Sequence, residues 1–197
     1  NQWVGAALAL SALSILTVYL FMYRARDQLD RNLNKTMIKL GKKMLRDALI
    51  PDDEGGIVAV DYVVLMPGGI LLFYLMNMPG NIYGGMRMDQ WTQLLGSKSN
   101  HFGNPLYALG ESVRVVRSLL PGIKVEGKVV FLPSAQFPKG RPENVCLLNA
   151  LPDEISSLYI PANKIEMNDA WDKLVSIING NQNQNYLQAK ITRFDRI

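Results

Sequence analysis

The feature that most constrains this 197-residue chain is an uncharged run near its N-terminus. No charged side chain occurs from Trp3 to Tyr23, and most of these residues are apolar. An α-helix rises about 1.5 Å per residue, so about 20 apolar residues match a hydrocarbon core about 30 Å thick. Trp3 and Tyr23 lie at the two ends, where interfacial aromatic rings prefer to be. The sequence therefore predicts a single transmembrane helix over residues 1–23, followed by one soluble domain.

Two other interpretations of this run are less favoured. A cleaved signal peptide needs a basic start, a shorter apolar core and a small-residue cleavage site. Asn1 and Gln2 are uncharged, and residues 23–26 (Tyr-Arg-Ala-Arg) make a poor cleavage site. A buried core helix would be apolar on one face only, whereas this run is apolar all round. We therefore expect a permanent membrane anchor.

Basic residues follow the run and set the expected orientation. They are Arg24, Arg26, Arg31, Lys35, Lys39, Lys42, Lys43 and Arg46, opposed by Asp27, Asp30 and Asp47. Positively charged flanks stay in the cytoplasm. The sequence thus predicts a single-pass protein of the inner (cytoplasmic) membrane, with its N-terminus outside and its domain cytoplasmic. Arg24, Arg26, Arg31 and Lys35 are expected to contact anionic headgroups, at about 1 kcal/mol each; the alternative is a solvated helix face.

The anchor also carries small residues on one side. Ala7, Ser11 and Ser14 are spaced by four and three positions, so they share a helix face. Small side chains allow two membrane helices to approach closely. We expect this face to contact a membrane-protein partner, whose identity the sequence does not name; the alternative is a simple tether.

Composition excludes several kinds of site. The chain has one cysteine, Cys146, and one histidine, His101, so it has neither an intramolecular disulfide nor a Cys- or His-rich metal centre. The formal charge is only +4, and its excess lies beside the anchor. Nucleic acid therefore remains a possible partner that the charge balance does not support, and we predict no cofactor.

After the anchor, the hydrophobic pattern predicts an α/β domain. We expect an amphipathic, basic juxtamembrane helix over 24–50, a core over 51–155 and a helical extension over 156–197. Pro67-Gly68-Gly69 separates two apolar runs that predict a β-hairpin. The expected strands are 57–65, 70–76, 82–83, 125–132 and 145–148, and the expected helices are 105–120, 167–178 and a last one from 182. An irregular stretch is expected over 85–103, a loop over 133–142, a helical turn opening at 152–154 and a cap at 179–181.

The residues from 61 to 70, Asp-Tyr-Val-Val-Leu-Met-Pro-Gly-Gly-Ile, resemble a stretch of the nuclease-related domain family, NERD. The similarity continues through 77–84, 91–93 and 102–106, and it covers about 40–155. The resemblance implies a restriction-endonuclease-like mixed sheet flanked by helices, as in PD-(D/E)xK nucleases. Such enzymes hold Mg²⁺ with two carboxylates beside a lysine, because Mg²⁺ takes hard oxygen ligands and activates a water.

The chain departs from this pattern where the chemistry would be. Asp61 matches the family aspartate, but Tyr74 and Met76 stand where the second carboxylate and the lysine are expected. Lys42 stands where the early helical glutamate would be. The resemblance therefore implies a relic site of Asp61, Tyr74, Met76 and Lys42, without catalytic residues and without a metal. We expect Asp61 to bond backbone amides or Lys42; the alternative is a relic metal ligand.

These observations predict a membrane-anchored, catalytically degenerate NERD domain, an accessory or scaffold subunit at the cytoplasmic membrane face. The alternative is nucleic-acid binding, or nuclease activity through a rearranged site. Charged residues that could form such a site are Asp89, Lys98, His101 and Glu111, although nothing in their spacing links them. The hypotheses differ in whether Asp61 lines an open basic cleft or is closed over by Tyr74, Met76 and Lys42.

Overall fold

The computed structural model describes residues 40–41, 43–52 and 54–192, and side chains as far as residue 180. The chain divides into two compact units, residues 1–40 and 41–197. The expected transmembrane helix lies outside the described residues, as do Ala7, Ser11, Ser14, Arg24, Arg26, Arg31 and Lys35. Within the described part, no helix has the length and apolar character needed to cross a membrane. The predictions for the first forty residues therefore stay predictions.

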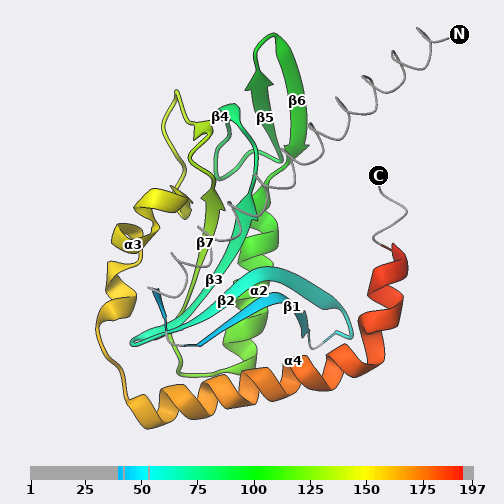
Figure 1. Cartoon of the computed structure of the whole chain (residues 1–197), viewed down its shortest axis with the longest axis vertical. Coiled ribbons are helices and arrows are strands. Elements are labelled where there is room, and N and C mark those ends of the chain that lie inside the picture. Colours follow the sequence, from blue (N-terminus) through cyan, green and yellow to red (C-terminus); the bar gives the residue numbers. More distant parts are fainter. Residues whose placement is uncertain (1–39, 42, 53, 193–197) are drawn as a thin grey trace, which may run out of the picture. The chain divides into compact units, whose positions relative to one another are not determined.

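A five-stranded mixed sheet forms the centre of the second unit, in the order β1-β2-β3-β7-β9 (Figure 1). Strands β1 to β3 form an antiparallel meander, and β7 and β9 continue it in parallel. The predicted hairpin is confirmed, with Met66 paired to Gly69 across the turn. The strands are β1 Lys43–Pro51, β2 Ile57–Met66, β3 Gly69–Met76, β7 Val125–Phe131 and β9 Val145–Leu147.

The two glycines of the Pro67-Gly68-Gly69 turn are needed because backbone approaches them closely. A Cβ atom at Gly68 would lie 2.2 Å from the carbonyl oxygen of Ile160, and one at Gly69 would lie 2.4 Å from that of Lys124. The Gly68 N–H also donates to the Leu158 carbonyl at 2.8 Å. The turn is thus a docking point for two other segments of the chain as well as a reversal of direction.

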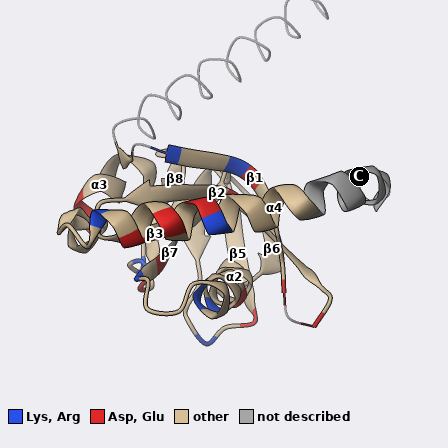
Figure 2. Ribbon diagram, turned by 90° about the horizontal axis from the view of Figure 1, so that it is seen from below, with Lys and Arg blue, Asp and Glu red and all other residues tan. Residues whose placement is uncertain are grey.

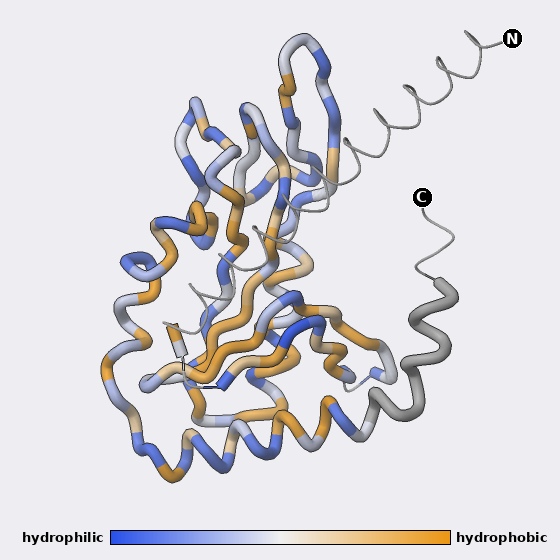
Figure 3. Tube along the Cα trace, viewed as in Figure 1, coloured by the Kyte–Doolittle hydropathy of each residue, from blue (hydrophilic) through white to orange (hydrophobic). Residues whose placement is uncertain are grey.

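Helix α2, Pro105–Leu119, is the crossover that makes β7 parallel to β3. Its buried residues Val115 and Val116 pack into one core cluster with Leu72 of β3 and Leu174 of α4. In Figure 3, β2 and β3 at the centre of the large sheet are correspondingly mostly hydrophobic along their length. The prediction of a helix that begins at Pro105 is confirmed.

A second, four-stranded sheet has the order β6-β5-β4-β8. The prediction that 85–103 is irregular is wrong, because this stretch contains a hairpin. Trp91 and Gln93 of β5 are buried and alternate with less buried neighbours, but β6 is an exposed edge strand with no apolar alternation to signal it. The strands are β4 Gly80–Tyr83, β5 Gln90–Leu95, β6 Lys98–Gly103 and β8 Ala135–Gln136.

The C-terminal part is helical. Short turns η1 Leu148–Ala150, α3 Leu151–Glu154 and η2 Ser156–Tyr159 precede the long helix α4, Lys164–Thr192. Met167, Trp171 and Leu174 bury one face of α4 in the core shared with β1 and α2 (Figure 2). The predicted cap at 179–181 is wrong, because the helix continues through it. One glycine inside a helix costs only about 1 kcal/mol.

Strand β1 overturns part of the predicted juxtamembrane helix. Residues 43–49 were expected to be helical, because apolar residues recur there at spacings of three and four. Instead Lys43–Pro51 pairs with β2 along its length. Ala48 and Ile50 are buried in the core. Pairing with the edge of β2 gives the backbone N–H and C=O groups hydrogen-bond partners, as a helix would. Tertiary pairing thus outweighs a local helical pattern, while residues 24–39 lie outside the described part.

Candidate functional site

Asp61 lies in the middle of β2 and is half-buried. Its Oδ2 atom accepts a hydrogen bond from the backbone N–H of Leu75 on β3, at 2.8 Å. A carboxylate in an apolar strand is costly unless it is bonded or paired. The expectation of a backbone amide partner is met by Leu75. Lys42 lies outside the described residues, so the predicted Asp61–Lys42 pair stays a prediction.

Tyr74 occupies the space beside Asp61 on the side of the sheet covered by α2. Tyr62 pairs with Phe73, so Asp61 and Tyr74 fall opposite each other on adjacent strands. The Tyr74 hydroxyl donates to the Ala59 carbonyl at 2.5 Å. It also lies 2.8 Å from the Ser112 hydroxyl on α2, which is then the donor to the phenol oxygen. One side chain thereby joins β2, β3 and α2.

The surroundings of Tyr74 keep its phenol protonated. Burial raises the pKa of Tyr74 most, the hydrogen bond from Ser112 lowers it, and the charge of Asp61 raises it. The net shift of the pKa is upward from 10.0. A neutral phenol already bonded on both sides is a poor proton acceptor near neutral pH and carries no negative charge.

Met76 follows two positions after Tyr74, so the two side chains share a face of β3. Both pack against one hydrophobic cluster that includes Leu109, Val129 and Phe131. The positions where the family pattern has an acid and a lysine are therefore part of an apolar layer between β3 and α2. Among the described residues, no group of three or more His, Cys, Asp or Glu side chains could hold a metal ion.

We expect Tyr74→Phe to lower the free energy of unfolding by about 1–2 kcal/mol, because it removes the hydroxyl that donates to the Ala59 carbonyl and leaves Ser112 without its acceptor. Thermal unfolding of the full chain in mild detergent measures this. The matched control is Tyr107→Phe, whose hydroxyl donates to Asp89 on the exposed surface at 3.0 Å. Equal effects of the two changes would contradict a bracing role for Tyr74.

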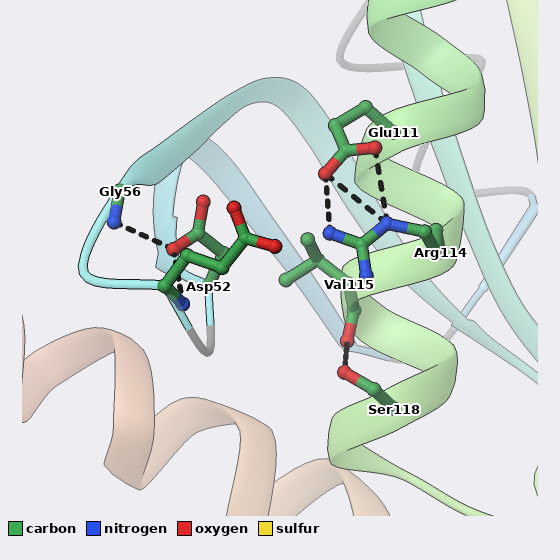
Figure 4. A network of polar contacts seen from close by, with 7 residues as sticks. Asp52, Gly56, Glu111, Arg114, Val115 and Ser118 are labelled. Atoms are coloured by element: carbon green, nitrogen blue, oxygen red, sulfur yellow. Dashed lines mark hydrogen bonds and ion pairs between the residues drawn. The ribbon is translucent and has the colours of Figure 1, made fainter.

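The other charged candidates are not brought together. Glu111 pairs with Arg114 one turn along α2, at 2.6 Å, and this hydrogen bond is the main cause that lowers the pKa of Glu111. Asp89 accepts from Tyr107, and His101 contacts Thr92 across the β5–β6 hairpin at 3.1 Å. In Figure 4, acidic groups of the loop after β1 face the Glu111–Arg114 pair. Asp52 of that loop accepts from the N–H groups of Glu54 and Gly56.

A row of side chains on the other face of the large sheet was not foreseen from the sequence. The Arg46 guanidinium lies 5.3 Å from the centre of the Tyr62 ring, which stacks on Phe73 at 4.6 Å. Phe73 is the lateral neighbour of Lys128 on β7, which is only 9% exposed. The Lys128 ammonium lies 3.5 Å from Asn144 Oδ1 and 3.8 Å from Glu154 Oε2.

This row crosses four strands with a cation at each end of an aromatic pair. Its only signal in the sequence is the single lysine in the apolar run Val125–Phe131. Nearby, burial raises the pKa of the Cys146 thiol to about 11, so the thiol stays protonated and is not a nucleophile. The row is a structural ion-pair and stacking network, and it points away from α2 and Tyr74.

The residues shared with the NERD pattern hold the small sheet in place. The Asn104 amide donates to the carbonyls of Gly85, Met86 and Met88 at 3.3, 3.2 and 2.8 Å. Its Oδ1 atom accepts from the N–H of Leu106 and so caps α2. Trp91 packs directly over Gly84, where a Cβ atom would lie 2.0 Å from the ring. These contacts give Asn104, Trp91 and Gly84 an architectural role.

A mixed α/β domain with two mixed sheets and a crossover helix is thus the class of protein that the fold defines. The sequence model of the nuclease-related domain, NERD, matches residues 21–132, and the chain belongs to this family. The suggested resemblance is thereby confirmed. Comparison with curated proteins and with solved structures finds no match.

Proposed function

We propose that this protein is a membrane-anchored, catalytically degenerate NERD domain that acts as an accessory or scaffold subunit at the cytoplasmic face of the inner membrane. The observation that carries the proposal is Tyr74, which fills the place of the second carboxylate and bonds Ala59 and Ser112. The uncharged run from Trp3 to Tyr23 supports the anchor. A membrane protein that packs against Ala7, Ser11 and Ser14 is the proposed partner.

The strand order supports a restriction-endonuclease-like core for this domain. An antiparallel meander, β1 to β3, is followed by the α2 crossover and by β7 parallel to β3. A metal-dependent nuclease with such a sheet needs a second carboxylate and a lysine near Asp61, since the metal must activate water and neutralise the phosphate. Tyr74 and Met76 supply neither an anionic ligand nor a cation.

We expect no Mg²⁺- or Mn²⁺-dependent cleavage of DNA or RNA by the full chain in mild detergent. The reason is that Asp61 stands without an acid at Tyr74 or a lysine at Met76. Gel assays on single- and double-stranded substrates test this, with Asp61→Ala and a mock purification beside the parent chain. Cleavage that is lost in Asp61→Ala and absent from the mock preparation would instead support a nuclease with a rearranged site.

The orientation gives a second expected result. A reporter that is active only in the cytoplasm, fused after Ile197, should be active, because basic residues flank the anchor on the domain side. Activity of a reporter that works only outside the cytoplasm would refute the orientation. Replacing Arg24, Arg26, Arg31 and Lys35 by Gln in the same fusion is the control, since it should weaken the preference.

A further inference from the structure

Three apolar side chains stand out on the surface between η2 and the first turn of α4. Ile160 is 71% exposed, Ile165 72% and Tyr159 39%, and the two isoleucines are the most exposed large apolar residues of the described chain. Exposed Pro67, in the β2–β3 turn, lies against the same segment. We call these four residues the Ile160 patch.

The backbone under the Ile160 patch is held in place. The Gly68 N–H donates to the Leu158 carbonyl at 2.8 Å, and the Ala162 N–H donates to the Pro67 carbonyl at 3.0 Å. Asn163 then caps α4, because its Oδ1 atom accepts from the Ile165 N–H at 3.1 Å. A fixed backbone therefore presents apolar side chains to the surroundings, which favours a binding surface over a loose loop.

The chain enters the second unit at the same end of the large sheet. A Cβ atom at Gly41 would lie 2.6 Å from the Leu65 carbonyl oxygen, and Lys43 pairs with Leu65, the next-to-last residue of β2. Met66 and Gly69 close the turn that bonds the Ile160 segment. The covalent link to residues 1–40, with their uncharged run, is thus at the end that carries the Ile160 patch.

We propose that the Ile160 patch inserts into the interfacial layer of the lipid bilayer beside the anchor. This inference rests on the anchoring proposed above. Exposed aliphatic side chains gain from leaving water, and tyrosine is suited to the headgroup level. The basic residues near the patch have acidic neighbours: Lys124 pairs with Glu126 at 2.9 Å, and Glu166 follows Lys164 by two residues. Because these opposite charges offset each other, the proposed contact with the bilayer is apolar rather than electrostatic.

The size of the patch favours a bilayer over a protein as its occupant. A stable protein interface buries about 1,200–2,000 Å² in total, far more than four side chains provide. A contact with the membrane can be weak and still persist, because an anchor holds the domain at the surface and raises the effective concentration. The patch would then fix the orientation of the domain on the membrane. The side with the Ile160 patch would face the bilayer, and the side with the β5–β6 hairpin would face away (Figure 1).

Site-specific fluorescence on the full chain in phospholipid vesicles tests this inference. Cys146 is buried, with a raised thiol pKa, so a cysteine introduced at an exposed position is the one that reacts. The same polarity-sensitive dye is attached to Ile160→Cys and to a control, Leu95→Cys. Leu95 is 48% exposed in the parent chain and lies at the tip of the β5–β6 hairpin. We expect the dye at 160 to be quenched several-fold more by lipids brominated on the acyl chain, and several-fold less by aqueous iodide, than the dye at 95.

Equal quenching by iodide at both positions would overturn the inference. A dye at 160 that is shielded from iodide and also from the brominated lipids would overturn it too, because a partner protein or a second copy of the chain would then cover the patch. An alkaline wash of the vesicles tests the anchor separately. A chain that stays in the vesicles with a water-exposed dye at 160 overturns the bilayer contact alone, and a chain that washes off overturns the anchor and the contact together.

Discussion

Trp91→Ala should lower the free energy of unfolding by about 3–5 kcal/mol, the cost of replacing a fully buried tryptophan by alanine. Trp91 is 0% exposed and lies between Phe102, at 6.1 Å, and Phe131, at 6.4 Å between ring centres. Phe131 belongs to β7, so the indole joins the small sheet to the large one. The cavity left behind would open directly over Gly84.

The measurement is thermal unfolding of the full chain in mild detergent, where a loss of this size lowers the midpoint by about 6–20 °C. The matched control is Leu95→Ala on the same strand, because Leu95 is exposed and its truncation should change stability by less than about 0.5 kcal/mol. A midpoint for Trp91→Ala near that of the control would contradict a bracing role. Trp91→Phe should lie between the two, since it keeps a ring but loses the N–H donor to Gly85.

Asn104→Ala should cost about 2–4 kcal/mol, because it combines a lost helix cap with the loss of the amide hydrogen bonds to the carbonyls of the neighbouring loop. The Asn104 amide donates hydrogen bonds to three backbone carbonyls of the loop, those of Gly85, Met86 and Met88. The same side chain accepts the Leu106 N–H. The loop and the start of α2 should therefore loosen together, which hydrogen exchange at both segments would detect alongside the change in unfolding midpoint.

Asn104→Ser separates the two contributions. Serine is also a good N-cap, but it lacks the amide that bonds the three carbonyls. We expect Asn104→Ser to recover about 1 kcal/mol of the loss, the usual value of a cap. Full recovery would mean that the carbonyl bonds contribute nothing, and no recovery would mean that the cap contributes nothing.

Much of the central sheet could be predicted from local signals. The hairpin of β2 and β3 follows from two apolar runs around Pro67-Gly68-Gly69, and α2 follows from Asn104-Pro105 before an amphipathic run. Strand β1 could not be predicted in this way, because the spacing of its apolar residues suits a helix and only its pairing with β2 makes it a strand. The β5–β6 hairpin was missed because an exposed edge strand has no apolar face to reveal it.

The candidate site was predictable in part. The family pattern aligned Asp61, Tyr74 and Met76, and the cost of a carboxylate in an apolar strand predicted a backbone amide or Lys42 as the partner of Asp61, but no signal predicted what Tyr74 contacts. The structure adds the bond from Leu75 to Asp61 and the bonds of Tyr74 to Ala59 and Ser112. It also adds the row from Arg46 to Lys128, whose members come from four strands and are neighbours only through sheet register.

The sequence by itself determined the features that depend on neighbouring residues: the uncharged run that can span a bilayer, the turn glycines, the start of α2 and the identities of residues 61, 74 and 76. These are local because propensity, capping and side-chain chemistry act over a few residues. Only the tertiary structure decided that residues 43–51 form a strand, that Tyr74 reaches α2, and that the Ile160 segment bonds the turn at Pro67. The first depends on pairing with β2, and the other two join segments far apart in the chain. Burial in a common core or a shared edge of the sheet, rather than local pattern, sets the free energy of all three.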